Sequence, residues 1–343
     1  MKIYTNNDLK TMKSWSLERK IRVTQTRIME WYQHYGGNVA VSFSGGADST
    51  ILLDLARRCY PNMEAVFVNT TLEFPEIIKF VKSFENVTTL KPKISYRNVI
   101  EKYGYPVISK EVSNYIHKMR INNDCMEAYK NKIHLQSAEW LRENLNAIPF
   151  SFLKCMLGLS KERVEKFRET GILPKSKFAI PSEWHSLIEA PFEISDRCCY
   201  HLKKAPVKKY CNRTGRKMII GTLAEESMLR KQIWLKQGCN AFDASEPKST
   251  PLSFWTAQDI LRYLKLTNIP YCSLYGDITE GEDKKLKFTG YQRTGCAGCL
   301  YGCHLEETPN RIQKLKDTHP AIYNYLFEKL GYGPVCDYVG IAY

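Results

Sequence analysis

"NVAVSFSGGADSTILLDLARRCYPNMEAVFVNT", residues 38–70, decides how the chain folds. The stretch opens with a short apolar run, turns at two glycines, continues with helix-forming residues and closes with a second apolar run. This pattern predicts a buried strand over 38–44, a helix over 47–60 and another strand over 64–70. Because strands joined through a helix run parallel, the stretch predicts an α/β fold built on a parallel sheet.

The residues on either side extend this pattern. Residues 15–35 carry apolar side chains at helical spacing, and the helix is expected to end at Gly36 and Gly37. Residues 87–93 are expected to form a further strand. The α/β pattern therefore begins close to the N-terminus and continues beyond residue 90.

The middle of the chain has a different character. Residues 112–185 are rich in charged, aromatic and helix-forming residues, whereas 216–227 indicate a return to the sheet, and Thr256 is expected to cap a later helix. A last helix is expected around 320–330. We therefore expect four segments: 1–111 with the first half of the α/β domain, 112–190 as a helical insertion, 191–285 as the rest of the α/β domain, and 286–343 as a cysteine-rich and helical region.

The composition narrows the function classes. Fifty Lys and Arg residues against 36 Asp and Glu give a net charge of +14, which suits a polyanionic partner, either a nucleotide or a nucleic acid. No apolar run is long enough to span a membrane, and the first residues lack the apolar core of a secretion signal, so a cytoplasmic location is expected. Twelve cysteines in a reducing compartment favour metal or thiol chemistry over disulfides.

The glycine turn at Gly45 and Gly46 has the character of a phosphate site. Ligands of open parallel sheets bind beyond the carboxyl ends of the strands, where the next helix presents free amide groups. Asp48 is informative because a carboxylate beside phosphate is repulsive unless a metal ion lies between them. We therefore predict a bound pyrophosphate group with Asp48 facing Mg²⁺. A tight turn with a serine cap is the alternative, and the stretch matches neither the Walker A nor the G-x-G-x-x-G pattern.

Four stretches carry a resemblance to a known family. "SFSGGADS" (42–49) resembles the PP-loop of ATP pyrophosphatases, and "FVNTTLEFPEI" (67–77) resembles the second signature of phosphoadenosine phosphosulfate (PAPS) reductases. "GTLAEESMLR" (221–230) and "PLSFWTAQDI" (251–260) are similar to later family segments, in the same order. The resemblance covers about residues 40–300. It implies an adenine nucleotide alpha-hydrolase-like fold: a doubly wound parallel sheet that binds the nucleotide at the strand tips.

The resemblance also implies which residues form the site. Asp48 would be catalytic through Mg²⁺, and Arg230 would be catalytic because family members place a substrate-binding arginine there. The expected ATP-binding residues are Ser42, Ser44, Gly45, Gly46, Asp48, Ser49, Thr50, Asn69, Glu73, Gly221 and Glu225. For Glu73, an exposed loop acid with no ligand is the alternative.

The cysteines point to a metal centre. Cys198 and Cys199 are adjacent, and "TGCAGCLYGCH" (294–304) supplies Cys296, Cys299 and Cys303, so five thiols compete for four ligand positions. Adjacent cysteines suit the larger face of an iron–sulfur cube better than compact tetrahedral zinc. Adenylyl-sulfate reductases, DNA phosphorothioation ATPases and tRNA thiolation enzymes, which this chain resembles, imply a [4Fe–4S] cluster, with zinc as the alternative. Our preferred ligands are Cys198, Cys199, Cys296 and Cys299.

Two branches of the family imply different reactions. ATP pyrophosphatases keep the whole SGGxDS loop, cleave ATP to AMP and pyrophosphate and adenylate a substrate. Sulfonucleotide reductases have usually lost part of the loop and end with a Glu-Cys-Gly-x-His segment. This chain keeps the loop and ends with "GPVCDYVGIAY" (333–343), where Cys336 is a plain tail cysteine or a nucleophile.

We therefore expect an ATP pyrophosphatase that adenylates a substrate, perhaps nucleic acid, for iron–sulfur-dependent sulfur transfer. The alternatives are a sulfonucleotide reductase that releases sulfite, and a non-catalytic nucleotide-binding subunit of a complex. Expected partners are an adenine nucleotide, a nucleic-acid substrate and a cysteine desulfurase or other thiol donor. No membrane partner is expected, and oligomerisation is left open.

Overall fold

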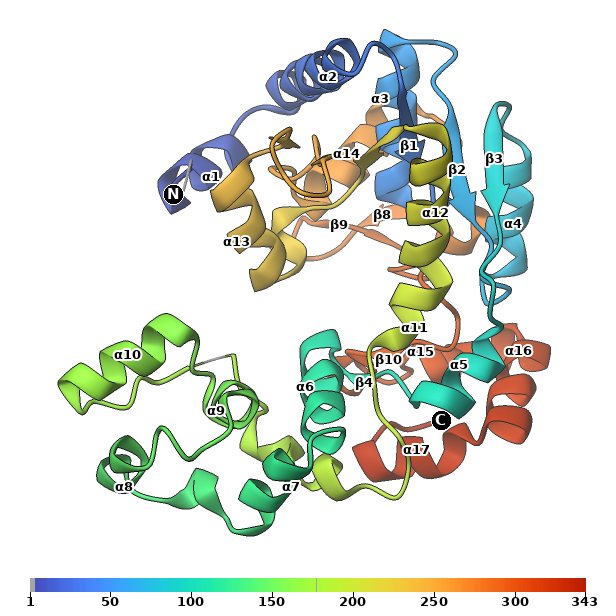
Figure 1. Ribbon diagram of the computed structural model, residues 1–343. Coiled ribbons are helices and arrows are strands. Elements are labelled where there is room, and N and C mark those ends of the chain that lie inside the picture. Colours follow the sequence, from blue (N-terminus) through green and yellow to red (C-terminus); the bar gives the residue numbers. More distant parts are fainter. Residues whose placement is uncertain (1–3, 177) are drawn as a thin grey trace. The chain divides into compact units, whose positions relative to one another are not determined.

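The structure is a computed structural model that describes residues 4–176 and 178–343. The chain forms two compact units, which Figure 1 shows coloured by sequence. The first comprises the chain up to Lys93 together with Leu202–Ala297, and the second comprises Ile94–His201 together with Gly298–Tyr343. The expected helical segment 112–190 lies wholly within the second unit.

The first unit is built on a six-stranded sheet with the strand order β3-β2-β1-β5-β7-β6. The strands are β1 (Val39–Ser42), β2 (Ala65–Val68), β3 (Val87–Leu90), β5 (Lys217–Ile220), β6 (Asn240–Ala241) and β7 (Lys248–Ser249). Neighbouring strands are parallel except β6, which runs antiparallel to β7. The predicted parallel sheet and its first three strands are therefore confirmed.

The register of the central strands decides where the site lies. Ser42, the last residue of β1, pairs with Val66 of β2 on one side and with Ile220, the last residue of β5, on the other. The carboxyl ends of β1, β2 and β5 therefore meet at one edge of the sheet. The loops that follow these three strands carry the predicted nucleotide-binding residues to that edge.

Helices cover both faces of this sheet. The helices of the first unit are α1 (Asn6–Lys13), α2 (Leu17–His34), α3 (Ala47–Cys59), α4 (Pro75–Lys82), α12 (Ala205–Thr214), α13 (Met228–Gln237) and α14 (Ala257–Thr267). Tyr210 of α12 packs with Ala40, Val66 and Met218 on one face. Since side chains alternate along a strand, Val39 and Val41 lie on the opposite face, where α3 contacts β1. The predicted doubly wound architecture is confirmed (Figure 1).

Several local predictions are also confirmed. The helix over 15–35 is α2, and both Gly36 and Gly37 beyond its end have positive φ. Thr256 caps α14, because its hydroxyl accepts a hydrogen bond from the Asp259 amide while the Asp259 carboxylate accepts one from the Thr256 amide. Helix α1 and the antiparallel hairpin of β8 (Ile278–Glu280) and β9 (Leu286–Phe288) were not predicted.

A buried ion pair ties α2 to α14. Lys20 is 1% exposed and its Nζ lies 2.6 Å from Asp259 Oδ2, and it also donates to the carbonyl of Lys13 at 2.7 Å. Nearby, the indole of Trp255 donates to the hydroxyl of Thr24 at 2.9 Å. These bonds satisfy polar groups that would otherwise be costly to bury.

The second unit is mainly helical. Its helices are α5 (Tyr96–Tyr103), α6 (Lys110–Arg120), α7 (Asn123–Lys130), α8 (Ala138–Glu143), α9 (Phe150–Leu157), α10 (Lys161–Thr170), α11 (Arg197–Cys199), α15 (Arg311–Thr318), α16 (Pro320–Asn324) and α17 (Tyr332–Val339). Two short parallel strands, β4 (Val107–Ile108) and β10 (Leu300–Tyr301), join its two chain segments. Within the described residues, no helix combines the length and the apolar character needed to cross a membrane.

Candidate functional site

The glycine loop is closed by its own hydroxyl groups. The Ser44 amide donates to Ser49 Oγ at 3.1 Å, and the Ser49 and Thr50 hydroxyls donate to the Gly46 carbonyl at 2.9 and 3.0 Å. Gly45 has φ +73°, and a Cβ there would lie 2.9 Å from Val81 Cγ2. Glycine is therefore required at 45 both by backbone conformation and by space.

A cavity of about 740 Å³ opens in the first unit against this loop. Seven of the twelve predicted catalytic and nucleotide-binding residues line it: Ser44, Gly46, Asp48, Ser49, Gly221, Glu225 and Arg230. They come from the loop after β1, the start of α3, the segment after β5 and the start of α13. The convergence follows from the sheet register, which brings the ends of β1 and β5 together.

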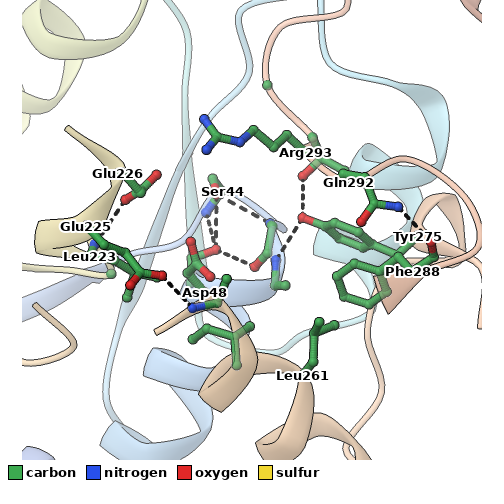
Figure 2. Close-up of a pocket in the computed structure, with 18 of the residues that line it drawn as sticks. Ser44, Asp48, Leu223, Glu225, Glu226, Leu261, Tyr275, Phe288, Gln292 and Arg293 are labelled. Atoms are coloured by element: carbon green, nitrogen blue, oxygen red, sulfur yellow. Dashed lines mark hydrogen bonds between the residues drawn. The ribbon is translucent and has the colours of Figure 1, made fainter. Parts of the chain in front are cut away.

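The carboxyl group of Asp48 is strongly perturbed by its surroundings. Burial raises the pKa of Asp48 to about 6, and the charge of Glu225 adds to the shift, while the guanidinium groups of Arg230 and Arg293 oppose it. Figure 2 shows Asp48 at the centre of the cavity, with Glu225 to one side and Arg293 beyond Ser44. A carboxyl group near two arginines at the start of a helix forms a site suited to phosphate and a cation.

The wall formed by residues 221–230 holds its charges in fixed pairs. Glu225 accepts a hydrogen bond from the Ala257 amide at 2.7 Å and pairs with Lys13 at 2.7 Å. Glu226 accepts from the Leu223 amide at 3.0 Å and pairs with Arg230. Glu225 thus supports the wall of the cavity, and its direct contact with nucleotide stays a prediction.

The opposite wall contains residues that the sequence analysis did not select. Tyr275 Oη accepts a hydrogen bond from the Ala47 amide at 2.9 Å and lies 2.7 Å from Thr294 Oγ1. Burial raises the pKa of Tyr275 to about 12, so the hydroxyl is protonated at neutral pH. Arg293 and Gln292 line the same wall (Figure 2). In the sequence, the only indication of this wall was the polar run Gln292–Thr294, shortly before Cys296.

The loop after β2 is held by its own polar groups. Glu73 accepts hydrogen bonds from the Thr70 amide at 2.7 Å and from the Thr70 hydroxyl at 2.8 Å, and Asn69 accepts one from the Thr71 amide at 2.9 Å. Like Ser42, Gly45 and Thr50, neither Asn69 nor Glu73 lines the cavity, so their nucleotide contacts stay predictions.

The same loop contacts the cysteine motif. Thr70 Oγ1 lies 4.0 Å from Cys296 Sγ, and the amide of Ala297 donates to the Leu72 carbonyl at 2.9 Å. Together with Thr294, these contacts fix the segment that leads from the cavity to Cys296.

Three of the predicted thiols share one environment in the second unit. Cys198 Sγ and Cys199 Sγ lie 4.0 Å apart on α11, and both, together with Cys299, act electrostatically on the buried hydroxyl of Tyr301. Cys303 is also in this unit, where burial raises its pKa to about 11. Within the described residues, no three His, Cys, Asp or Glu side chains are close enough to hold a single metal ion.

Cys336, the tail cysteine, is fully buried in α17. Burial raises the pKa of its thiol to about 12, and the neighbouring Cys303 adds to the shift. A thiol with these properties is a poor nucleophile, because the thiolate is the reactive form. The interpretation of Cys336 as a plain structural cysteine fits this environment.

The other cysteines are mostly buried. Cys125, Cys155 and Cys272 are fully buried, and Cys239 is 5% exposed. Cys59 and Cys211 are half-buried. The buried thiols of Cys125, Cys155, Cys239 and Cys272 act as small apolar side chains of the core.

Comparison with known proteins gives one family model and several relatives. The family model of the phosphoadenosine phosphosulfate reductase domain matches residues 38–144 and 166–301. An uncharacterised protein of Methanocaldococcus jannaschii is 30% identical over 119 residues, covering 33% of this chain and 29% of the relative. The adenosine 5'-phosphosulfate reductase of Staphylococcus haemolyticus is 30% identical over 103 residues, covering 27% of this chain and 42% of the relative.

Two further matches were found. Adenosine 5'-phosphosulfate reductase 2 of Bacillus subtilis is 26% identical over 110 residues, covering 29% of this chain and 47% of the relative. Each match to these curated relatives spans less than half of the relative's length. The crystal structure of PAPS reductase from Candida auris in a phosphate complex aligns with a TM-score of 0.37 and 13% identity, over 79% of this chain and 90% of that one.

Proposed function

The chain belongs to the phosphoadenosine phosphosulfate reductase domain family, and on that premise we propose that it is an ATP pyrophosphatase. In this proposal the cavity at the glycine loop binds ATP with Mg²⁺. An oxygen of an acceptor attacks the α-phosphorus, the bond between the α-phosphorus and the bridging oxygen breaks, and pyrophosphate leaves with that oxygen. The products are an adenylated acceptor and pyrophosphate, and displacement of AMP by a sulfur nucleophile completes the transfer.

The observation that carries the proposal is the position of Asp48. Its carboxyl group lines the cavity on the first turn of α3, where the free amides of the helix favour an anion. A carboxylate there opposes the binding of a phosphate or sulfate ester alone, whereas it favours a phosphate that carries a divalent cation. The intact loop thus fits a metal–nucleotide complex better than an activated sulfate ester.

Two arginines supply the complementary charge. Arg230 and Arg293 both line the cavity and act electrostatically on Asp48. Guanidinium groups bind phosphate oxygens and stabilise the charge that develops on a leaving pyrophosphate. We assign Arg230 and Arg293 this role, with Asp48 as the protein ligand of Mg²⁺.

We also propose a [4Fe–4S] cluster in the second unit, which would bind the sulfur to be transferred. Thiolates are the ligands that such clusters prefer, and Cys198, Cys199 and Cys299 all act electrostatically on one buried hydroxyl group, that of Tyr301. Cys303, in the same unit, is a candidate for the fourth ligand. Cys296, which the sequence analysis preferred, lies in the first unit and stays a prediction from the sequence. Zinc is the alternative, but the adjacent thiols of Cys198 and Cys199 suit compact tetrahedral zinc less well than the larger face of an iron–sulfur cube.

A second candidate function is reduction of an adenylyl sulfate. Curated relatives from Staphylococcus haemolyticus, Staphylococcus epidermidis and Bacillus subtilis are named adenosine 5'-phosphosulfate reductases. That reaction needs an accessible thiolate to attack the sulfate sulfur. The buried Cys336, with its raised pKa, does not offer one. This observation ranks the reductase below the ATP pyrophosphatase.

Product analysis tests the proposal. Anaerobically purified protein is incubated with Mg²⁺, ATP labelled in the α-phosphate, and bulk tRNA or duplex DNA as the acceptor. We expect labelled AMP or AMP-linked nucleic acid and pyrophosphate, which Asp48→Asn abolishes and Asp54→Asn, on the same helix but paired with Arg58, leaves intact. ADP as the product, or sulfite released from adenylyl sulfate with thioredoxin, would overturn it.

A further inference from the structure

Three tyrosines of the second unit have buried hydroxyls that the thiols of Cys198 and Cys299 influence electrostatically. They are Tyr96 on α5, Tyr301 on β10 and Tyr332 on α17. Burial raises the pKa of each phenol, and the thiols of Cys198 and Cys299 are among the neighbours that shift all three. Each phenol carries one hydrogen that it can donate.

Two of the three phenolic hydrogens are used within the protein. Tyr332 Oη donates to the carbonyl of Gly298 at 2.7 Å. The hydroxyls of Tyr96 and Tyr332 also contact each other in a short hydrogen bond. Since the single hydrogen of Tyr332 is directed at Gly298, Tyr96 must be the donor to Tyr332. Neither of these two phenols has a hydrogen left for another acceptor.

Tyr301 differs from both. Its hydroxyl oxygen is completely buried and has no hydrogen-bond partner in the part of the chain that the structure describes. Its backbone is held firmly, because Tyr301 pairs with Ile108 in the sheet and the next amide, that of Gly302, donates to the Ile108 carbonyl at 2.8 Å. Buried hydroxyls in proteins are almost always hydrogen-bonded, so a fixed donor of this kind needs an acceptor.

The surroundings of this hydroxyl identify the acceptor. The charged or ionisable neighbours that act on it are, in order, the thiols of Cys198, Cys199 and Cys299 and then the carboxylate of Asp196. Asp196 already accepts a hydrogen bond from Asn114 at 3.0 Å, whereas Cys299 is two residues from Tyr301 in the chain. Thiolates and the sulfides of an iron–sulfur cluster accept hydrogen bonds from such donors, and these bonds help to set the reduction potential.

We propose that Tyr301 donates a hydrogen bond to a cysteinyl or sulfide sulfur of the cluster and raises the cluster's reduction potential. Tyr301 is a positioning residue, not a ligand. The proposal rests on the cluster included in the proposed function. A hydrogen bond to sulfur stabilises the added negative charge of the reduced cluster, so its loss lowers the potential.

Potentiometric titration of the cluster, followed by electron paramagnetic resonance, tests this role in wild type, Tyr301→Phe and Tyr96→Phe. Tyr96→Phe is the matched control. It removes a buried phenol that the same thiols influence, but the hydrogen of this phenol already goes to Tyr332. We expect equal iron and sulfide contents in all three proteins. In Tyr301→Phe alone, the ratio of reduced to oxidised cluster at a fixed potential should fall by about threefold or more, where tenfold corresponds to about 59 mV for one electron.

Resonance Raman spectra give an independent readout. Iron–sulfur stretching bands should move to higher frequency in Tyr301→Phe and stay in place in Tyr96→Phe, because a sulfur without a hydrogen bond binds iron more strongly. Unchanged potential and bands in Tyr301→Phe, or equal changes in both variants, would overturn the role of Tyr301 and leave the cluster intact. Wild-type protein that contains no iron, or zinc in its place, would instead contradict the cluster itself and the role of Tyr301 with it.

Discussion

The hydroxyl of Tyr275 lies 2.9 Å from the amide nitrogen of Ala47, the first residue of α3. This contact joins a residue that follows α14 to the glycine loop after β1, and the Thr294 hydroxyl, 2.7 Å from the same oxygen, extends it toward the cysteine motif. The loop that we propose to bind phosphate is therefore held from outside as well as by its own serines.

Removal of this hydroxyl should destabilise the first unit. Tyr275→Phe leaves the Ala47 amide and the Thr294 hydroxyl without their shared partner, and a buried polar group without a partner costs about 1–3 kcal/mol. Urea denaturation without nucleotide measures the loss. Tyr271→Phe is the control, because its ring packs 5.8 Å from that of Phe288, which also contacts Tyr275. Equal stability of the two variants would show that the contact contributes nothing.

Alanine at Gly45 should be more harmful than alanine at another glycine of positive φ. A Cβ at Gly45 would press on Val81 and Ile77, whereas one at Gly36, where φ is +55°, meets no atom within 4 Å. Both substitutions carry the backbone cost of about 1–2 kcal/mol, and only Gly45→Ala adds steric strain of about 1–3 kcal/mol. Thermal denaturation of the two variants checks this. The same loss in both would mean that the loop adjusts freely.

The stability of the ligand-free protein should depend on pH through Asp48. Its pKa is raised from 3.8 to about 6 in the folded state, so the protonated form stabilises the fold. This contribution is fully present below about pH 3.8 and is lost as the pH rises through about 6. The free energy of unfolding of Asp48→Asn should lack this decrease. Urea denaturation of both proteins from pH 4 to 7 measures the difference, and parallel pH profiles would contradict the raised pKa.

The buried ion pair should matter far more than an exposed one. Lys20→Met leaves the carboxylate of Asp259 buried without its cation, which typically costs about 3–5 kcal/mol. Lys208→Met breaks an exposed pair with Glu246 of similar length and should cost less than about 1 kcal/mol. Chemical denaturation compares the two. A small loss in Lys20→Met would show that the core around α2 and α14 tolerates an uncompensated carboxylate.

The local pattern of the sequence was enough to predict the sheet and the glycine loop. Apolar runs, a glycine pair and a helix with a capping threonine depend on neighbours in the chain, and β1, α3, β2 and the cap at Thr256 all form as expected. The register that brings Asp48 and Arg230 to one cavity follows from parallel strand pairing.

The opposite wall could not be predicted in this way. Tyr275 reaches Ala47 across 228 residues, and its position depends on a short hairpin, β8–β9, that carries no strong strand pattern. Glu73 shows that the sequence can also indicate a ligand contact where the structure has a hydrogen bond within the loop. An acid after a strand fits a ligand-binding role, but here its carboxylate is bonded to Thr70 in its own loop.

The most direct test of the account is calorimetric titration of the ligand-free protein with ATP and with adenosine 5'-phosphosulfate, each with and without Mg²⁺. We predict that ATP binds only with Mg²⁺, that Asp48→Asn weakens this binding by about tenfold or more, equal to about 1.4 kcal/mol, and that adenosine 5'-phosphosulfate binds more weakly. Tighter binding of adenosine 5'-phosphosulfate, independent of Mg²⁺ and unchanged or improved in Asp48→Asn, would contradict the assignment of this cavity to ATP cleavage.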